Sequence, residues 1–85
     1  MYEVYLERRA ERDLKRLPEE QFQRVASQLK ALADNPRPVG SRKLSGSKSY
    51  WRVRVGDYRI VYEIDDEVRA VRVMRVRHRG KVYRP

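Results

Sequence analysis

The sequence predicts an α+β domain in which two N-terminal helices, forming a helical hairpin, pack on a mostly antiparallel four-stranded sheet. Three observations lead to this prediction. Apolar residues recur at helical spacing in the first half of the chain. In the second half, apolar residues alternate with polar or charged ones, and Gly56-Asp57 joins two such alternating runs. The predicted order is β-α-α-β-β-β, which is typical of helices on one face of an antiparallel sheet. With 85 residues, the chain has the size of a single domain, residues 1–85.

The first half of the chain favours one strand and two helices. Residues 2–6 (YEVYL) predict a short strand, and residues 7–17 predict a helix with an apolar face. Pro18 interrupts that pattern, and a proline followed by two glutamates is a favourable helix start. The second helix ends at DNPRP, residues 34–38. Its apolar face consists of Phe22, Val25, Ala26, Leu29, Leu32 and Ala33.

The second half of the chain favours a long connection and three strands. Residues 34–49 have the composition of a loop, and a connection this long is either a surface loop or a functional one. The strands are predicted at residues 50–55, 58–65 and 68–78, with residues 65–67 in the turn between the last two.

A two-residue turn at Gly56-Asp57 fixes which residues of the first two of these strands oppose each other. Opposed residue numbers then sum to 113, so Arg54 faces Arg59. One face is apolar and is expected to pack on the helices: Trp51, Val53, Val55, Tyr58, Ile60 and Tyr62. The other face is expected to be an exposed basic surface: Tyr50, Arg52, Arg54, Arg59, Val61 and Glu63. Opposed like charges destabilise a hairpin, so this surface is expected to meet an anion.

The end of the chain adds to the basic character. Residues 75–84 (RVRHRGKVYR) hold five Arg or Lys residues and no acid, and the alternating Arg75, Arg77 and Arg79 predict one basic edge. Earlier in this strand, apolar residues occupy both alternating positions, which favours a central strand covered on both sides. We expect Tyr50, Arg75, Arg77 and Lys81 to contact RNA, because arginine and lysine bind phosphates and tyrosine stacks on unpaired bases.

The overall composition narrows the possible partners. The formal net charge of +9 and pI of about 10.4 favour polyanions: nucleic acid, the ribosome, an anionic membrane or an acidic protein. The absence of cysteine and the single histidine, His78, predict neither a disulfide framework nor a metal site, and no cofactor is expected. No apolar run approaches the ~20 residues of a membrane span, so a cytoplasmic location without membrane contact is expected.

The stretch YWRVRVGDYRIVYEI followed by VMRVRHRGKVYR, behind two helices and a first strand, resembles the RelE/ParE superfamily of bacterial and archaeal toxins. The resemblance extends from Tyr2 to Arg84 and favours the RelE branch. It implies the toxin of a type II toxin–antitoxin system: a ribosome-dependent endoribonuclease (mRNA interferase) that cuts mRNA in the ribosomal A site by metal-independent 2′-OH transesterification. It also implies a cognate RelB-like antitoxin with an acidic or amphipathic segment, in a toxin–antitoxin hetero-oligomer.

The resemblance also implies site residues. The catalytic set is Arg52, Arg54, Arg59, Arg79 and Tyr83, with His78 as a secondary candidate. Within that set, Arg59 would contact the scissile phosphate, Arg79 would stabilise phosphate or act as the acid, and Tyr83 would stack on mRNA. The well-known RelE pattern has lysines where Arg52 and Arg54 stand, and arginine is effectively never deprotonated. The general base is therefore another group, such as His78 or Tyr83, or catalysis depends on electrostatics and positioning.

Two other functions remain open at this point. The same fold serves ParE-type toxins, which inhibit DNA gyrase without cutting nucleic acid. A catalytically inactive RNA- or ribosome-binding module is the third possibility, because the family's lysines are replaced here.

Overall fold

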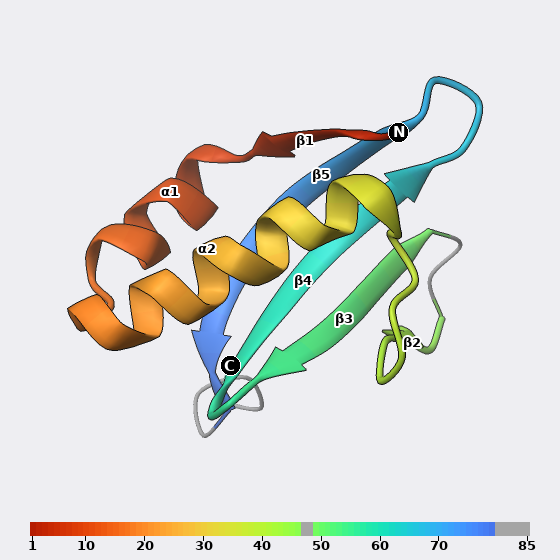
Figure 1. Ribbon diagram of the computed structural model, residues 1–85. Coiled ribbons are helices and arrows are strands. Elements are labelled where there is room, and N and C mark those ends of the chain that lie inside the picture. The colour runs from red at the N-terminus through yellow and green to blue at the C-terminus, as the bar shows by residue number, and fades with distance from the viewer. Residues whose placement is uncertain (47–48, 80–85) are drawn as a thin grey trace.

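One sheet and two helices make up the structure. The computed structural model describes residues 1–46 and 49–79. Its elements are β1 (Glu3–Leu6), α1 (Arg8–Lys15), α2 (Glu19–Asp34), β2 (Arg42–Lys43), β3 (Tyr50–Val55), β4 (Tyr58–Asp65) and β5 (Ala70–His78). The strands form one sheet in the order β1-β5-β4-β3-β2, with α2 lying across one face (Figure 1). The predicted α+β class is confirmed.

The sheet has five strands rather than the four predicted. The additional strand is β2, a two-residue strand inside the predicted loop, where Arg42 lies opposite Arg52 of β3. Such a short edge strand has no alternating pattern of its own, because its pairing depends on β3 being present. β1 runs parallel to β5, and the other strand pairs are antiparallel.

The predicted register of the β3–β4 hairpin is confirmed. Arg54 lies opposite Arg59, and Val55 lies opposite Tyr58. Gly56 has φ +58°, whereas Asp57 does not have a positive φ. A positive φ at the first turn position alone is the geometry of a type II′ turn, which favours glycine there.

The core lies between the helices and the apolar face of the sheet. Val53, Ile60 and Tyr62 are buried, as predicted, and Trp51 and Tyr58 pack against them at the margin. Tyr62 is fully buried, and its hydroxyl donates a 2.7 Å hydrogen bond to the carbonyl oxygen of Pro36. Burial raises the pKa of Tyr62. This hydrogen bond attaches the segment after α2 to the centre of the sheet.

The prediction that β5 is covered on both faces is wrong. The β4–β5 pairing shifts between Val61 and Tyr62, so that Val61 lies opposite Arg75 and Tyr62 lies opposite Val73. Met74 is the extra residue of this β-bulge, which changes the alternating phase of the strand. Val71, Val73 and Val76 therefore all face the core, although their numbers differ in parity. Arg72 on the other face is exposed.

α1 is attached to the edge of β5 beyond the end of β1. The side chain of Asp13 accepts hydrogen bonds from the backbone N–H of Val76 (2.9 Å) and from Nε (2.9 Å) and Nη2 (3.2 Å) of Arg75. A carboxylate that occupies an open strand edge in this way satisfies a backbone donor that a further strand would otherwise pair. The position of α1 relative to the sheet is thereby fixed.

The opposite end of the sheet is connected by a polar cluster. Arg37, which follows α2, donates hydrogen bonds to both carboxylate oxygens of Asp66 (3.3 and 2.8 Å), and Tyr2 donates to the same carboxylate. The Arg37 guanidinium also lies 5.1 Å from the centre of the Trp51 ring. These contacts connect the N-terminal strand, the loop after α2 and the β4–β5 turn.

Candidate functional site

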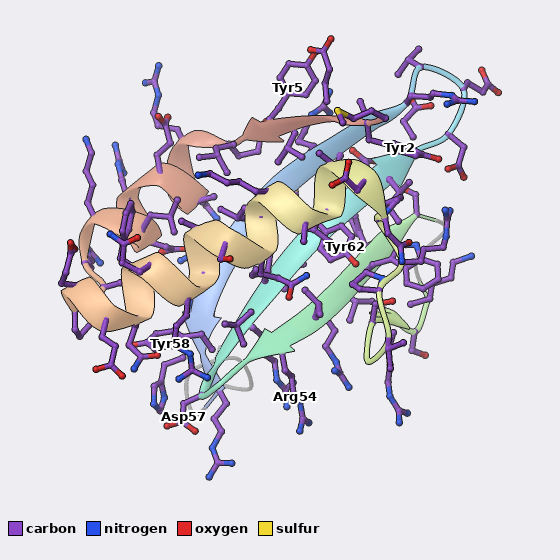
Figure 2. The ribbon with its side chains drawn as sticks, viewed as in Figure 1. Tyr2, Tyr5, Arg54, Asp57, Tyr58 and Tyr62 are labelled. Carbon is purple, nitrogen blue, oxygen red and sulfur yellow. The ribbon has the colours of Figure 1, made fainter. Side chains whose placement is uncertain are left out.

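Three arginines form a row across the face of the sheet that is turned away from the helices. Arg54 on β3 lies opposite Arg59 on β4, and Arg59 lies opposite Arg77 on β5. Directly opposed side chains in an antiparallel pair have Cβ atoms about 5 Å apart. Arg54 extends from β3 away from α2, whereas Tyr58 lies beside the first turns of α2 (Figure 2). We call Arg54, Arg59 and Arg77 the arginine row.

The members of the arginine row differ in exposure. Arg54 is exposed and Arg77 is partly buried, but only 8% of Arg59 is exposed. The prediction that Arg59 belongs to an exposed surface is therefore wrong. Arg59 lies on the central strand β4, so the side chains of Arg54 and Arg77 on the adjacent strands flank it on both sides. The row thus presents a fixed central cation between two more accessible ones.

A second, less continuous basic row lies one step further from the hairpin turn. Arg42 of β2 lies opposite Arg52, Arg52 lies opposite Val61, and Val61 lies opposite Arg75. Arg42 was not among the predicted site residues. Its only sequence signal is the Arg-Lys pair in the predicted loop, since its position beside Arg52 depends on β2.

The remaining residues of this face lie at its far end. Tyr50 is opposite Glu63 and 39% exposed. Glu63 lies 3.4 Å from Nη1 of Arg72, so its carboxylate is paired away from the arginine row. The row and the acid of this face are therefore separated along the strands.

Arg75 is held by α1. Its ion pair with Asp13 raises the pKa of the Arg75 guanidinium. The Arg75 side chain is 31% exposed, and that of Asp13 is 11% exposed. Arg75 therefore has a structural partner in addition to its predicted contact with RNA.

His78 lies on the face opposite the arginine row. It pairs with Tyr58 of β4, and the two rings meet edge to face with their centroids 5.4 Å apart. The structure therefore does not bring this candidate base together with Arg54. Arg79 is exposed, and its backbone N–H donates a 2.7 Å hydrogen bond to the carbonyl oxygen of Asp57, at the hairpin turn. Lys81 and Tyr83 lie outside the described residues.

The arginine row can bind and stabilise a phosphate. Guanidinium groups donate paired hydrogen bonds to phosphate oxygens and remain charged. In residues 1–46 and 49–79, no group of three His, Asp or Glu side chains is arranged to hold a metal ion. In the same residues, no helix is long and apolar enough to cross a membrane.

Comparison with known proteins identifies relatives over nearly the whole chain. Residues 4–83 match the family described as the ParE toxin of the type II toxin–antitoxin system parDE. Toxin RelG of Mycobacterium tuberculosis is 38% identical over 98% of this chain and 97% of its own length. Toxin RelE of the same organism is 34% identical over 98% of this chain and 87% of its own length.

Solved structures share the fold. The RelBE2 toxin–antitoxin complex of M. tuberculosis contains a chain that superposes with a TM-score of 0.81 and 32% identity, covering 92% of this chain and 98% of that one. The archaeal RelE–RelB complex of Pyrococcus horikoshii gives a TM-score of 0.83 at 24% identity, covering 95% and 98%.

Proposed function

Because this chain belongs to the RelE/ParE superfamily of type II toxins and to its RelE branch, we propose that it cuts mRNA in the ribosomal A site. The cut is a metal-independent transesterification that stops translation, and a cognate antitoxin neutralises it. The observation that carries this proposal is the arginine row, which gathers three cations on one face of the sheet.

The chemistry makes specific demands on the row. The ribose 2′-oxygen attacks the adjacent phosphorus while the bond from phosphorus to the 5′-oxygen breaks, which leaves a 2′,3′-cyclic phosphate and a 5′-hydroxyl. Negative charge accumulates on the phosphorane, and donors that are already in position stabilise it. Arg59 is suited to this role because its burial restricts its motion. Arg54 and Arg77, on either side, complete the contact with the phosphate.

The arginines of this face cannot act as the general base for the 2′-OH proton. Neither Arg52 nor Arg54 can accept the 2′-OH proton at accessible pH. His78 is on the opposite face from Arg54. We infer that the exposed Arg54 stabilises the developing alkoxide electrostatically, and that Tyr83 remains the candidate side chain for the base and for stacking. Arg79 remains the candidate acid that gives a proton to the leaving 5′-oxygen.

The partner is proposed on the same grounds. Two of the related structures are the RelE–RelB complex of P. horikoshii and the RelBE2 toxin–antitoxin complex of M. tuberculosis. A RelB-like antitoxin with an acidic or amphipathic segment, lying across the helices or the basic face, would neutralise the opposed charges of Arg54 and Arg59.

A cell-free translation reaction tests the proposal. Purified protein is added, and primer extension maps any cuts in the mRNA. We expect cuts inside codons only when ribosomes are translating. The double variant Arg54→Gln/Arg77→Gln should lower the cutting rate at least 100-fold, since loss of one preorganised donor to a transition-state anion costs about 10²–10³.

A matched control removes two charges elsewhere on the surface. The double variant Lys15→Gln/Lys30→Gln changes exposed helix residues and should cut at close to the unmodified rate. Equal rates for the two double variants would refute the assignment of the arginine row.

The family description names ParE, so gyrase inhibition is the second candidate function. It predicts that stoichiometric protein blocks gyrase supercoiling and leaves translation intact. Ribosome binding without cuts would instead indicate an inactive RNA-binding module.

A further inference from the structure

A groove lined by arginines follows the seam between α1 and β5, beside the arginine row. It consists of three adjoining depressions of about 320, 170 and 240 Å³, all bordered by Arg75. The basic residues that line this α1–β5 groove are Arg8, Arg9, Arg12, Arg16, Arg75 and Arg77. Arg77 borders the groove and is also a member of the arginine row, so the two surfaces meet at this residue, although His78 and Tyr58, on the helix side of the sheet, line the same depression.

One wall of the groove is a stripe of arginines on α1 and the residue that follows it. Arg9, Arg12 and Arg16 recur at spacings of three and four residues, which places them on the same side of a helix. From Arg9 to Arg16 the chain advances about 10 Å along the helix axis, so the three guanidinium groups are spread along a line rather than gathered at one point. The stripe can therefore face two or more consecutive phosphates.

The charges of this stripe are not compensated by nearby acids. Across the part of the chain that the structure describes, no carboxylate lies within 4.0 Å of the Arg9, Arg12 or Arg16 guanidinium. Asp13, which lies among them, is engaged by Arg75 and by the Val76 amide. Of the two acids that line this groove, Asp13 is therefore satisfied by β5, and the carboxylate of Glu7 lies 3.7 Å from Nε of Arg72, so the stripe remains available to an external anion.

We propose that the α1–β5 groove is a second RNA-binding site, which holds the phosphate backbone of an RNA strand beyond the nucleotide at the arginine row. This inference rests on the proposed function, because it extends the path of the same substrate. A strand that leaves the arginine row past Arg77 enters the groove directly.

The chemistry of the groove favours RNA over a protein partner. A protein segment that docks on a helix uses apolar anchors. The apolar residues of α1, Ala10 and Leu14, are buried in the core. The groove itself is lined by six arginines together with apolar residues such as Leu17 and Met74, and the guanidinium groups suit phosphate.

A binding experiment tests this site separately from catalysis. The probe is a fluorescently labelled 12-nucleotide RNA with 2′-O-methyl groups, which lacks the free 2′-OH nucleophile and so cannot be cut. Its Kd for the full chain is measured by fluorescence anisotropy at several salt concentrations. The test variant is Arg9→Gln/Arg12→Gln/Arg16→Gln.

The matched control is Lys15→Gln/Lys30→Gln/Arg69→Gln, which removes the same charge from exposed residues that do not line the groove. If the stripe contacts three phosphates, the test variant should reduce the salt slope by about 2, because each single-strand contact contributes about 0.7. That corresponds to roughly 100-fold weaker binding at 0.1 M salt. The control should change Kd less than threefold.

Three results would overturn the site. Equal losses in the test and control variants would show that only total charge matters. An unchanged Kd in the test variant would show that RNA binds elsewhere. The groove would be a protein-binding site if an acidic peptide displaces the RNA, binds more tightly than the RNA does, and binds only to protein in which the arginine stripe is intact. The two proposals can also fail separately. If only the test variant loses RNA binding, and the unmodified protein does not cut mRNA in the translation reaction, the groove is an RNA-binding site but the proposed catalysis is wrong.

Discussion

Replacing Asp13 by alanine tests how α1 is held against β5. The Asp13 carboxylate accepts three hydrogen bonds, from Nε and Nη2 of Arg75 and from the backbone N–H of Val76. Its side chain is 11% exposed. The substitution removes every acceptor at once and leaves the Val76 amide without its side-chain partner.

The expected loss of stability follows from burial. Breaking a buried ion pair costs about 3–5 kcal/mol. The Arg75 side chain is 31% exposed, so water will solvate its guanidinium after the substitution. We therefore expect the free energy of unfolding to fall by about 2–3 kcal/mol. For a domain of this size, each kcal/mol lowers Tm by about 4–8 °C, so Tm should fall by roughly 10–20 °C.

Urea unfolding followed by circular dichroism measures this loss, with Arg72→Gln as the control. Arg72 lies 3.4 Å from Glu63 and 3.7 Å from Glu7, but its side chain is 53% exposed. Removing such a surface pair should cost less than about 1 kcal/mol. The reasoning fails if Asp13→Ala costs no more than Arg72→Gln, or if the double variant Asp13→Ala/Arg75→Ala loses the sum of the two single losses.

Two further changes probe the loop after α2. Tyr62→Phe removes the hydroxyl that donates a 2.7 Å hydrogen bond to the buried carbonyl oxygen of Pro36. It should lower the free energy of unfolding by about 1–2 kcal/mol, measured by urea unfolding. A loss below about 0.3 kcal/mol, the size of effects that act through the unfolded state, would show that this hydrogen bond does not stabilise the fold. Hydrogen bonds from Arg37 and Tyr2 lower the pKa of Asp66 below its usual 3.8. A lowered folded pKa contributes stability that is complete above the unfolded pKa and is lost as pH falls through the folded value. Urea midpoints of the unmodified protein and Asp66→Asn, compared between about pH 6 and pH 2, should therefore converge as the pH falls below 3.8; a difference that is independent of pH would contradict this origin.

Local chemistry was sufficient to predict the hairpin at the centre of the site. The Gly56-Asp57 turn and the alternation on either side of it specify one register, because a slip of one residue would move the arginines into the core. The opposition of Arg54 and Arg59 follows directly. The helices were likewise predictable from Pro18 and the apolar spacing.

Features that depend on tertiary pairing were not predictable in the same way. β2 forms because Arg42 and Lys43 pair with Arg52 and Trp51 at the edge strand β3. The bulge at Met74 has a sequence signal, the change of apolar parity between Val73 and Val76, but a strand covered on both faces has the same signal. The burial of Arg59 and the position of His78 on the helix side follow from the completed sheet.

The arginine row also determines how the protein responds to its solvent. Opposed like charges repel, and this repulsion lowers the stability of the unbound protein. Screening shortens the range of that repulsion from about 8 Å at physiological ionic strength to about 3 Å at 1 M salt. Salt should therefore stabilise the unbound protein while weakening its hold on RNA. A polyanion at free concentration [L] that binds only the folded form raises the free energy of unfolding by RT ln(1 + [L]/Kd). Thermal unfolding curves can therefore be used to detect which anions bind the protein.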